Sequence, residues 1–132
     1  TYNSSVLNTV AALKTIEIIE KQKNNFYKRL DAMRKKLSDE FYKIAKKKNI
    51  NINIQGIGSI FHISFTKKPV LNNHKDYLET DLKTSQKFIR TMQDNKIRIT
   101  GRGTWFISFA HSNTDIKNTI KSFKKSINNL NK

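Results

Sequence analysis

The spacing of the apolar residues changes several times along this chain of 132 residues, and these changes limit the folds it can adopt. Residues 6–23 and 26–44 carry apolar side chains at intervals of three and four, as amphipathic helices do. Two stretches with alternating apolar residues follow, at 50–54 and 60–66. Alternation of this kind is typical of half-buried strands. The first half of the chain therefore predicts two helices and then two strands.

The second half repeats this mixture. Residues 67–77 contain the single proline, Pro69, and are predicted to form a loop. A third helix is predicted over 81–95. Two short strands are predicted over 97–100 and 104–109, joined by a tight turn that the glycines on either side of Arg102 permit.

The last helix and the order of elements predict the fold class. Ser112 or Asn113 is expected to cap a helix whose apolar residues recur every three or four positions up to Leu130. The predicted elements do not show the regular alternation of strand and helix that builds a doubly wound parallel sheet. We therefore predict an α/β protein of the α+β type, a two-layer sandwich in which helices cover one face of a mostly antiparallel sheet of three or four strands.

The first helix has a broad apolar arc, which predicts burial on more than one side. The chain also begins at Thr1 rather than at a methionine. We interpret residues 1–23 as a connecting helix from a further domain, and residues 24–132 as the α+β domain itself.

The charge of the chain raises nucleic acid as a possible partner. Lysine and arginine number 26 against 10 acidic residues, a net charge of +16. However, 21 of the basic residues are lysines and 15 further residues are asparagines, which indicates a compositional bias. Proteins that recognise the bases and phosphates of nucleic acids rely more on arginine than on lysine. A basic nucleic-acid-binding module therefore remains the alternative function outside the enzymes.

Other compositional features exclude several kinds of site. The absence of cysteine excludes disulfides, thiolate metal sites and cysteine nucleophiles. No stretch approaches the roughly 20 apolar residues of a membrane span, so we expect no membrane partner and a cytoplasmic location. His62, His74 and His111 are scattered, and we predict no metal site. For His62 we expect an ordinary position in a sheet, and for His111 local hydrogen bonding.

Residues 102–109 resemble an RNA-recognition signature, which begins with a basic residue and glycine and ends with an aromatic residue. Thr104 stands where an aromatic residue should stack on a base, and the bulky Trp105 stands at a position that should be small. The two opening helices also differ from the element order of that fold. This motif is a second observation that favours the alternative of nucleic-acid binding.

Three segments together resemble one enzyme family. Residues 1–7 (TYNSSVL), 56–66 (GIGSIFHISFT) and 105–116 (WFISFAHSNTDI) are similar in order and spacing to the C-terminal domain of class III, pyridoxal-phosphate-dependent aminotransferases, and most like its aminomutase branch. Ser4, Ser5 and Val6 depart from the glycine, asparagine and proline usual there. The resemblance implies the small C-terminal domain of fold type I of these transferases.

The resemblance also implies where the cofactor lies. The family's Schiff-base lysine precedes the segment that matches Thr1, so none of the 21 lysines here takes that role and the chain alone is expected to be inactive. Thr1 resembles a donor to the cofactor phosphate in the neighbouring subunit of a homodimer; the alternative is a helix-capping threonine. Arg102 is the candidate for pairing with a substrate carboxylate, with a solvated turn arginine as its alternative.

The activity that the resemblance implies belongs to the full-length parent. That enzyme would act on a small amino acid substrate, converting glutamate 1-semialdehyde to 5-aminolevulinate for tetrapyrrole biosynthesis. A class III transaminase acting on another substrate is the alternative. In either case the cofactor carries the chemistry and the protein orients it and recognises the ends of the substrate.

Overall fold

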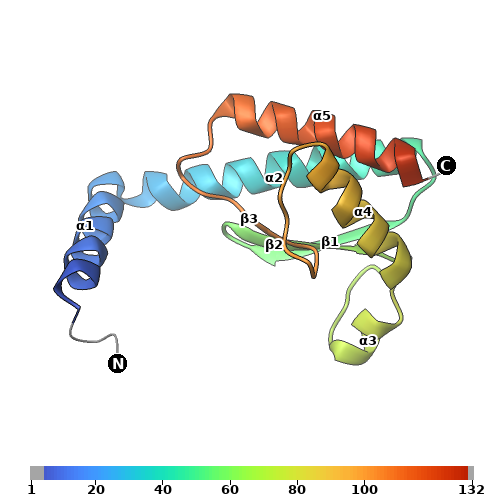
Figure 1. Cartoon of the computed structure of the whole chain (residues 1–132), viewed down its shortest axis with the longest axis horizontal. Coiled ribbons are helices and arrows are strands. Elements are labelled where there is room, and N and C mark those ends of the chain that lie inside the picture. Colours follow the sequence, from blue (N-terminus) through green and yellow to red (C-terminus); the bar gives the residue numbers. More distant parts are fainter. Residues whose placement is uncertain (1–4, 131–132) are drawn as a thin grey trace.

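The chain forms a small antiparallel sheet with helices packed on one of its faces (Figure 1). The computed structural model describes residues 5–130. The helices are α1 (Val6–Gln22), α2 (Asn24–Lys47), α3 (His74–Leu78), α4 (Leu82–Asp94) and α5 (Asn113–Leu130). The strands are β1 (Ile52–Ile57), β2 (Ile60–Phe65) and β3 (Thr104–Phe106). The predicted fold class is confirmed.

The register of the sheet separates its two faces. The strands lie in the order β1-β2-β3, with every neighbouring pair antiparallel. Directly opposite residues share a face, and successive residues alternate between faces. Phe61 pairs with both Gly56 and Trp105 on the face that the helices cover. A Cβ atom at Gly56 would lie 2.3 Å from the Ile60 carbonyl oxygen, so this position requires glycine.

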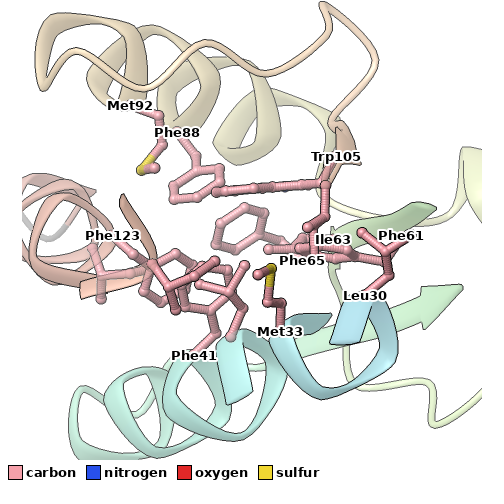
Figure 2. Close-up of a cluster of buried hydrophobic side chains, with 14 residues drawn as sticks. Leu30, Met33, Phe41, Phe61, Ile63, Phe65, Phe88, Met92, Trp105 and Phe123 are labelled. Carbon is pink, nitrogen blue, oxygen red and sulfur yellow. The ribbon is translucent and has the colours of Figure 1, made fainter. Parts of the chain in front are cut away.

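Aromatic rings dominate the core between the sheet and the helices α2, α4 and α5 (Figure 2). Phe41 of α2 and Phe123 of α5 are fully buried and stack with ring centroids 3.9 Å apart. Phe88 of α4 meets Phe123 edge-on at 5.4 Å. The rings of Phe41 and Phe88 also contact the sheet. The ring centroid of Phe41 lies 5.3 Å from that of Trp105, and the centroid of Phe88 lies 5.3 Å from that of Phe65. The core therefore joins all three of these helices to the sheet.

Helix α1 takes no part in this core. None of its residues is buried, and it projects away from the body of the molecule (Figure 1). Its apolar side chains stay largely exposed, among them Val6, Leu7, Val10, Leu13 and Ile16. The amphipathic helix predicted over 6–23 is present, but the described residues provide no surface that buries its broad apolar arc.

Two predicted strands differ from the structure. Residues 97–100 form no strand, because Ile97 donates its amide to the Met92 carbonyl at the end of α4, and Ile97 and Ile99 pack against the core as a loop. Strand β3 ends at Phe106 rather than 109, since the chain turns there towards α5. The β1 strand instead runs past the predicted 50–54 to Ile57.

The predicted loop over 67–77 contains the short helix α3, which sequence periodicity did not reveal. The side chain of Asn73 accepts a hydrogen bond from the Asp76 amide at 3.0 Å and so caps this helix. At α5 the expected cap is confirmed: Ser112 Oγ accepts from the Asp115 amide, and the Ser112 amide donates to Asp115 Oδ2 at 2.7 Å. Among residues 5–130, no helix has the length and apolar character needed to cross a membrane.

Candidate functional site

The face of the sheet opposite the helices carries an exposed apolar patch. Ile57 pairs with Ile60, and Ile60 pairs with Phe106, so the three side chains form one row across all three strands. Their exposed fractions are 86%, 46% and 62%. We call these three residues the open-face patch. Exposed apolar side chains that adjoin one another on a sheet can form a surface that packs against another part of a protein.

The other end of the same face is covered by the loop that follows β2. Asn53 donates its side-chain amide to the Pro69 carbonyl. Gln55 donates to the Leu71 carbonyl at 3.2 Å, and its side-chain oxygen accepts from the Leu71 amide at 2.8 Å. These bonds satisfy the backbone of a loop that has no strand partner. They also restrict the accessible part of the face to the open-face patch and its border.

A cluster of ion pairs joins the start of this loop to the short helix α3 and the residue that follows it. Lys68 Nζ lies 2.9 Å from Asp76 Oδ1 and also contacts Glu79 Oε2. The hydrogen bonds to Glu79 and Asp76 raise the pKa of Lys68, and the bond from Lys68 lowers the pKa of Asp76. Because the side chains of Lys68 and Glu79 are partly exposed to solvent, the cluster orders the loop but adds little to overall stability.

His62 lies at the border between the covered and the open part of the face. Its ring meets Tyr77 of α3 edge-on, with centroids 5.7 Å apart. Burial lowers the pKa of His62 below its usual value, so the ring is neutral at pH 7. Its expected position in the sheet is confirmed. His111 also behaves as expected, since its Nδ1 accepts a hydrogen bond from the Ser108 amide at 2.8 Å.

Arg102 lies in an exposed turn beside His62. The Gly103 amide donates to the Thr100 carbonyl at 2.9 Å and closes the turn. Gly103 has a φ of +85°, and a Cβ atom there would lie 3.3 Å from His62 Cε1. The structure thus places the turn with Arg102 next to the open face of the sheet. Among residues 5–130, Arg102 forms no ion pair, so its guanidinium is available for a carboxylate.

The other predicted contact, Thr1, lies outside the described residues. Of the two predicted contacts, the structure places Arg102 alone. Within residues 5–130, no group of histidine and acidic residues is arranged to bind a metal ion.

The described residues do not fit the aldehyde of pyridoxal phosphate. A lysine that condenses with this group must lose its proton, which burial in an apolar pocket promotes. Apart from the half-buried Lys68, every lysine within residues 5–130 is exposed. Lys68 is held by Asp76 and Glu79, which favour its charged form. The lysines within residues 5–130 therefore lack the surroundings that a Schiff-base lysine needs.

The burial of the aromatic residues bears on the RNA-binding alternative. Trp105 is only 5% exposed and faces the core, where it stacks on Phe61 at 5.4 Å. Phe106 is the exposed ring of this strand. Proteins that bind single-stranded nucleic acid stack successive bases on several exposed aromatic side chains. This sheet offers one, and the comparisons below give that alternative no support.

The open-face patch was not identified from the sequence. The alternation over 60–66 separates Phe61 from His62, but it did not reveal that Ile60 and Phe106 become neighbours. That pairing depends on the register between β2 and β3, which are distant in sequence. The signal that could have pointed to the patch is Ile57, an isoleucine next to the turn at Gly58 and outside both predicted strands.

Comparison with known sequences shows a similarity to part of one enzyme. No family model matches the chain. The glutamate-1-semialdehyde 2,1-aminomutase of Francisella philomiragia subsp. philomiragia is 30% identical over 128 residues, which are 95% of this chain and 29% of that protein. The chain thus spans under a third of the length of this curated relative.

Comparison with solved structures agrees. An omega-transaminase from Sphaerobacter thermophilus matches the whole chain with a TM-score of 0.82, at 15% identity and over 30% of its own length. A transaminase with PLP bound matches 84% of the chain with a TM-score of 0.69, at 14% identity and over 25% of its own length. These matches confirm the predicted resemblance: the chain has the fold of one part of the PLP-dependent transaminases, and its sequence is similar to one part of glutamate-1-semialdehyde 2,1-aminomutase.

Proposed function

We propose that this chain is the C-terminal domain of a pyridoxal-phosphate-dependent aminomutase that converts glutamate 1-semialdehyde to 5-aminolevulinate, a step of tetrapyrrole biosynthesis. The observation that carries the proposal is the sequence similarity to an aminomutase over 95% of the chain. The shared fold with transaminases supports it independently. The cofactor would act as the electron sink of the amino transfer, bound mainly by residues outside this chain.

Two exposed apolar surfaces support the role of an accessory domain. Helix α1 has no buried residue, and the open-face patch of Ile57, Ile60 and Phe106 faces solvent. We propose that residues 1–23 connect to the cofactor-binding domain and that residues 24–132 pack against it through the open face. Burial of both surfaces would remove apolar area from water and fix the domain next to the active site.

The turn with Arg102 would then lie at the edge of that interface. A guanidinium there can pair with a substrate carboxylate through two parallel hydrogen bonds. Thr1 would donate its hydroxyl to the cofactor phosphate of the neighbouring subunit in a homodimer. This arrangement, and a cytoplasmic location, are part of the proposal.

The test uses the complete gene product, purified with pyridoxal phosphate and supplied with glutamate 1-semialdehyde. The proposal predicts formation of 5-aminolevulinate. Replacement of Arg102 by Ala should raise KM more than it lowers kcat, because the lost contact binds the substrate in the ground state as well. Lys48→Ala, which removes an exposed charge of the same sign from the connection between α2 and β1, is the matched control and should leave KM unchanged.

The runner-up is a class III transaminase with another substrate, favoured by the structural match to an omega-transaminase. The same preparation decides between the two. Transfer of an amino group from an amino acid to a 2-oxo acid, without production of 5-aminolevulinate, would establish the transaminase and contradict the aminomutase.

A further inference from the structure

A hollow of about 630 Å³ lies between α5 and the loop that connects α4 to β3, and Phe106 of the open-face patch is among its lining residues. Its walls include Ile97 and Ile99 from the loop and Ile116 from α5, with Trp105 contributed from the sheet. The volume falls within the range of small-molecule sites, and isoleucine and tryptophan side chains give the lining an apolar part. The proposed aminomutase activity gives this hollow no role.

Basic side chains from both walls surround the hollow. Lys96 and Arg98 come from the loop, and Lys121 and Lys125 come from one face of α5, four residues apart. None of the four forms an ion pair with any carboxylate in the described part of the chain. Cations that lie within a Debye length of each other produce a shared positive potential that concentrates anions.

The one acidic residue in the lining does not cancel this potential effectively. Asp115 accepts hydrogen bonds from the Ser112 amide and hydroxyl, both at 2.7 Å. These bonds lower the pKa of Asp115 and tie its carboxylate to the start of α5. Four positive charges therefore face one negative charge that already serves as a helix cap.

A buried hydrogen-bond donor in the lining has no acceptor. Trp105 is 5% exposed, and its indole Nε1 is fully buried without a hydrogen-bond partner among the described residues. A buried donor without a partner costs about 1–3 kcal/mol, so most such groups find an acceptor in a protein or in a bound molecule. Trp105 is among the lining residues, so its indole N–H signal can report on a ligand bound in the hollow.

We propose that this hollow binds a small organic anion with an apolar part, such as a phosphate monoester of an aromatic alcohol. The apolar part would lie on Ile97, Ile99 and Ile116, and the anionic group would lie among the basic side chains. Inorganic phosphate offers the charge alone and a neutral aromatic alcohol the apolar part alone, so each should bind more weakly.

The test uses the single tryptophan of the chain as its reporter. Phenyl phosphate, inorganic phosphate and benzyl alcohol are titrated separately into the 15N-labelled 132-residue chain at low salt. The indole N–H signal of Trp105 is followed for each ligand. Phenyl phosphate is expected to shift this signal in a saturable manner, with a Kd at least about tenfold lower than those of the other two compounds. Added salt should weaken the binding.

Charge variants then locate the site. In Lys121→Gln/Lys125→Gln the Kd for phenyl phosphate is expected to rise about three- to tenfold, as two partly screened charges are lost. The matched control is Lys117→Gln/Lys124→Gln, which removes two exposed lysines of α5 that do not line the hollow, and it should leave the Kd unchanged. No shift of the indole signal, equal shifts by phenyl phosphate and inorganic phosphate, or an equal loss in the control pair would each overturn the proposal.

Discussion

At the scale of single residues, the turn that carries Arg102 depends on one glycine and not on the other. Gly103 has a φ of +85° and faces the His62 ring, whereas Gly101 has no such φ and no atom within 4 Å of an added Cβ. Gly103→Ala is expected to lower the free energy of unfolding by about 1–2 kcal/mol because of the left-handed backbone. Gly101→Ala should change it by less than about 0.5 kcal/mol. Urea unfolding measures both, and equal effects would contradict the described turn.

His62 predicts a pH dependence of stability. Burial lowers its folded-state pKa below the usual value of 6.5, so the unfolded chain binds a proton first as the pH falls. Stability should therefore be constant above about pH 7, decrease below about pH 6.5, and level off once the folded state is protonated too. The melting temperature between pH 8 and pH 5 reports this change.

The matched variants for that measurement are His62→Gln and His74→Gln. The first removes the half-buried ring, and the melting temperature should then change less over the interval. The second removes an exposed ring at the start of α3 and should leave the dependence on pH as it is. If the melting temperature of His62→Gln depends on pH as strongly as that of the unchanged chain, the loss of stability at low pH comes from another group.

At the scale of elements, α1 is expected to be dispensable for the fold of the isolated chain. None of its residues is buried, so deletion of residues 1–22 should change the free energy of unfolding by less than about 1 kcal/mol. Phe123→Ala, which removes a fully buried ring of the core, should lower it by about 3–5 kcal/mol and serves as the positive control. A deletion as harmful as Phe123→Ala would show that α1 packs on the domain.

The elements differ in how far the sequence predicts them. Helices α2, α4 and α5 are long and amphipathic, so their periodicity alone locates them. The segment 97–100 has the alternation of a strand but lacks a partner strand, and its isoleucines pack as a loop. Periodicity describes which side chains are buried and does not state which backbone groups find a partner. The cap of α3 at Asn73 was visible in the sequence, but a helix of five residues has no periodicity to detect.

At the scale of the whole molecule, the site is less predictable than the fold. Arg102 was located in a turn from its flanking glycines, and the structure adds that this turn lies against His62. The hollow with Lys96 and Lys121 joins residues that are distant in sequence, so composition could not separate these lysines from the remaining ones. The proposed function places the reactive amine outside this chain, and within residues 5–130 the lysines are exposed or, for Lys68, paired with carboxylates.

The most direct measurement traps pyridoxal phosphate on the complete gene product by borohydride reduction and maps the modified lysine by mass spectrometry. The account predicts a single stoichiometric adduct on a lysine outside these 132 residues, with no stoichiometric adduct on any of the 21 lysines within them. A stoichiometric adduct on one lysine of this chain, or a complete product that binds no pyridoxal phosphate, would contradict it.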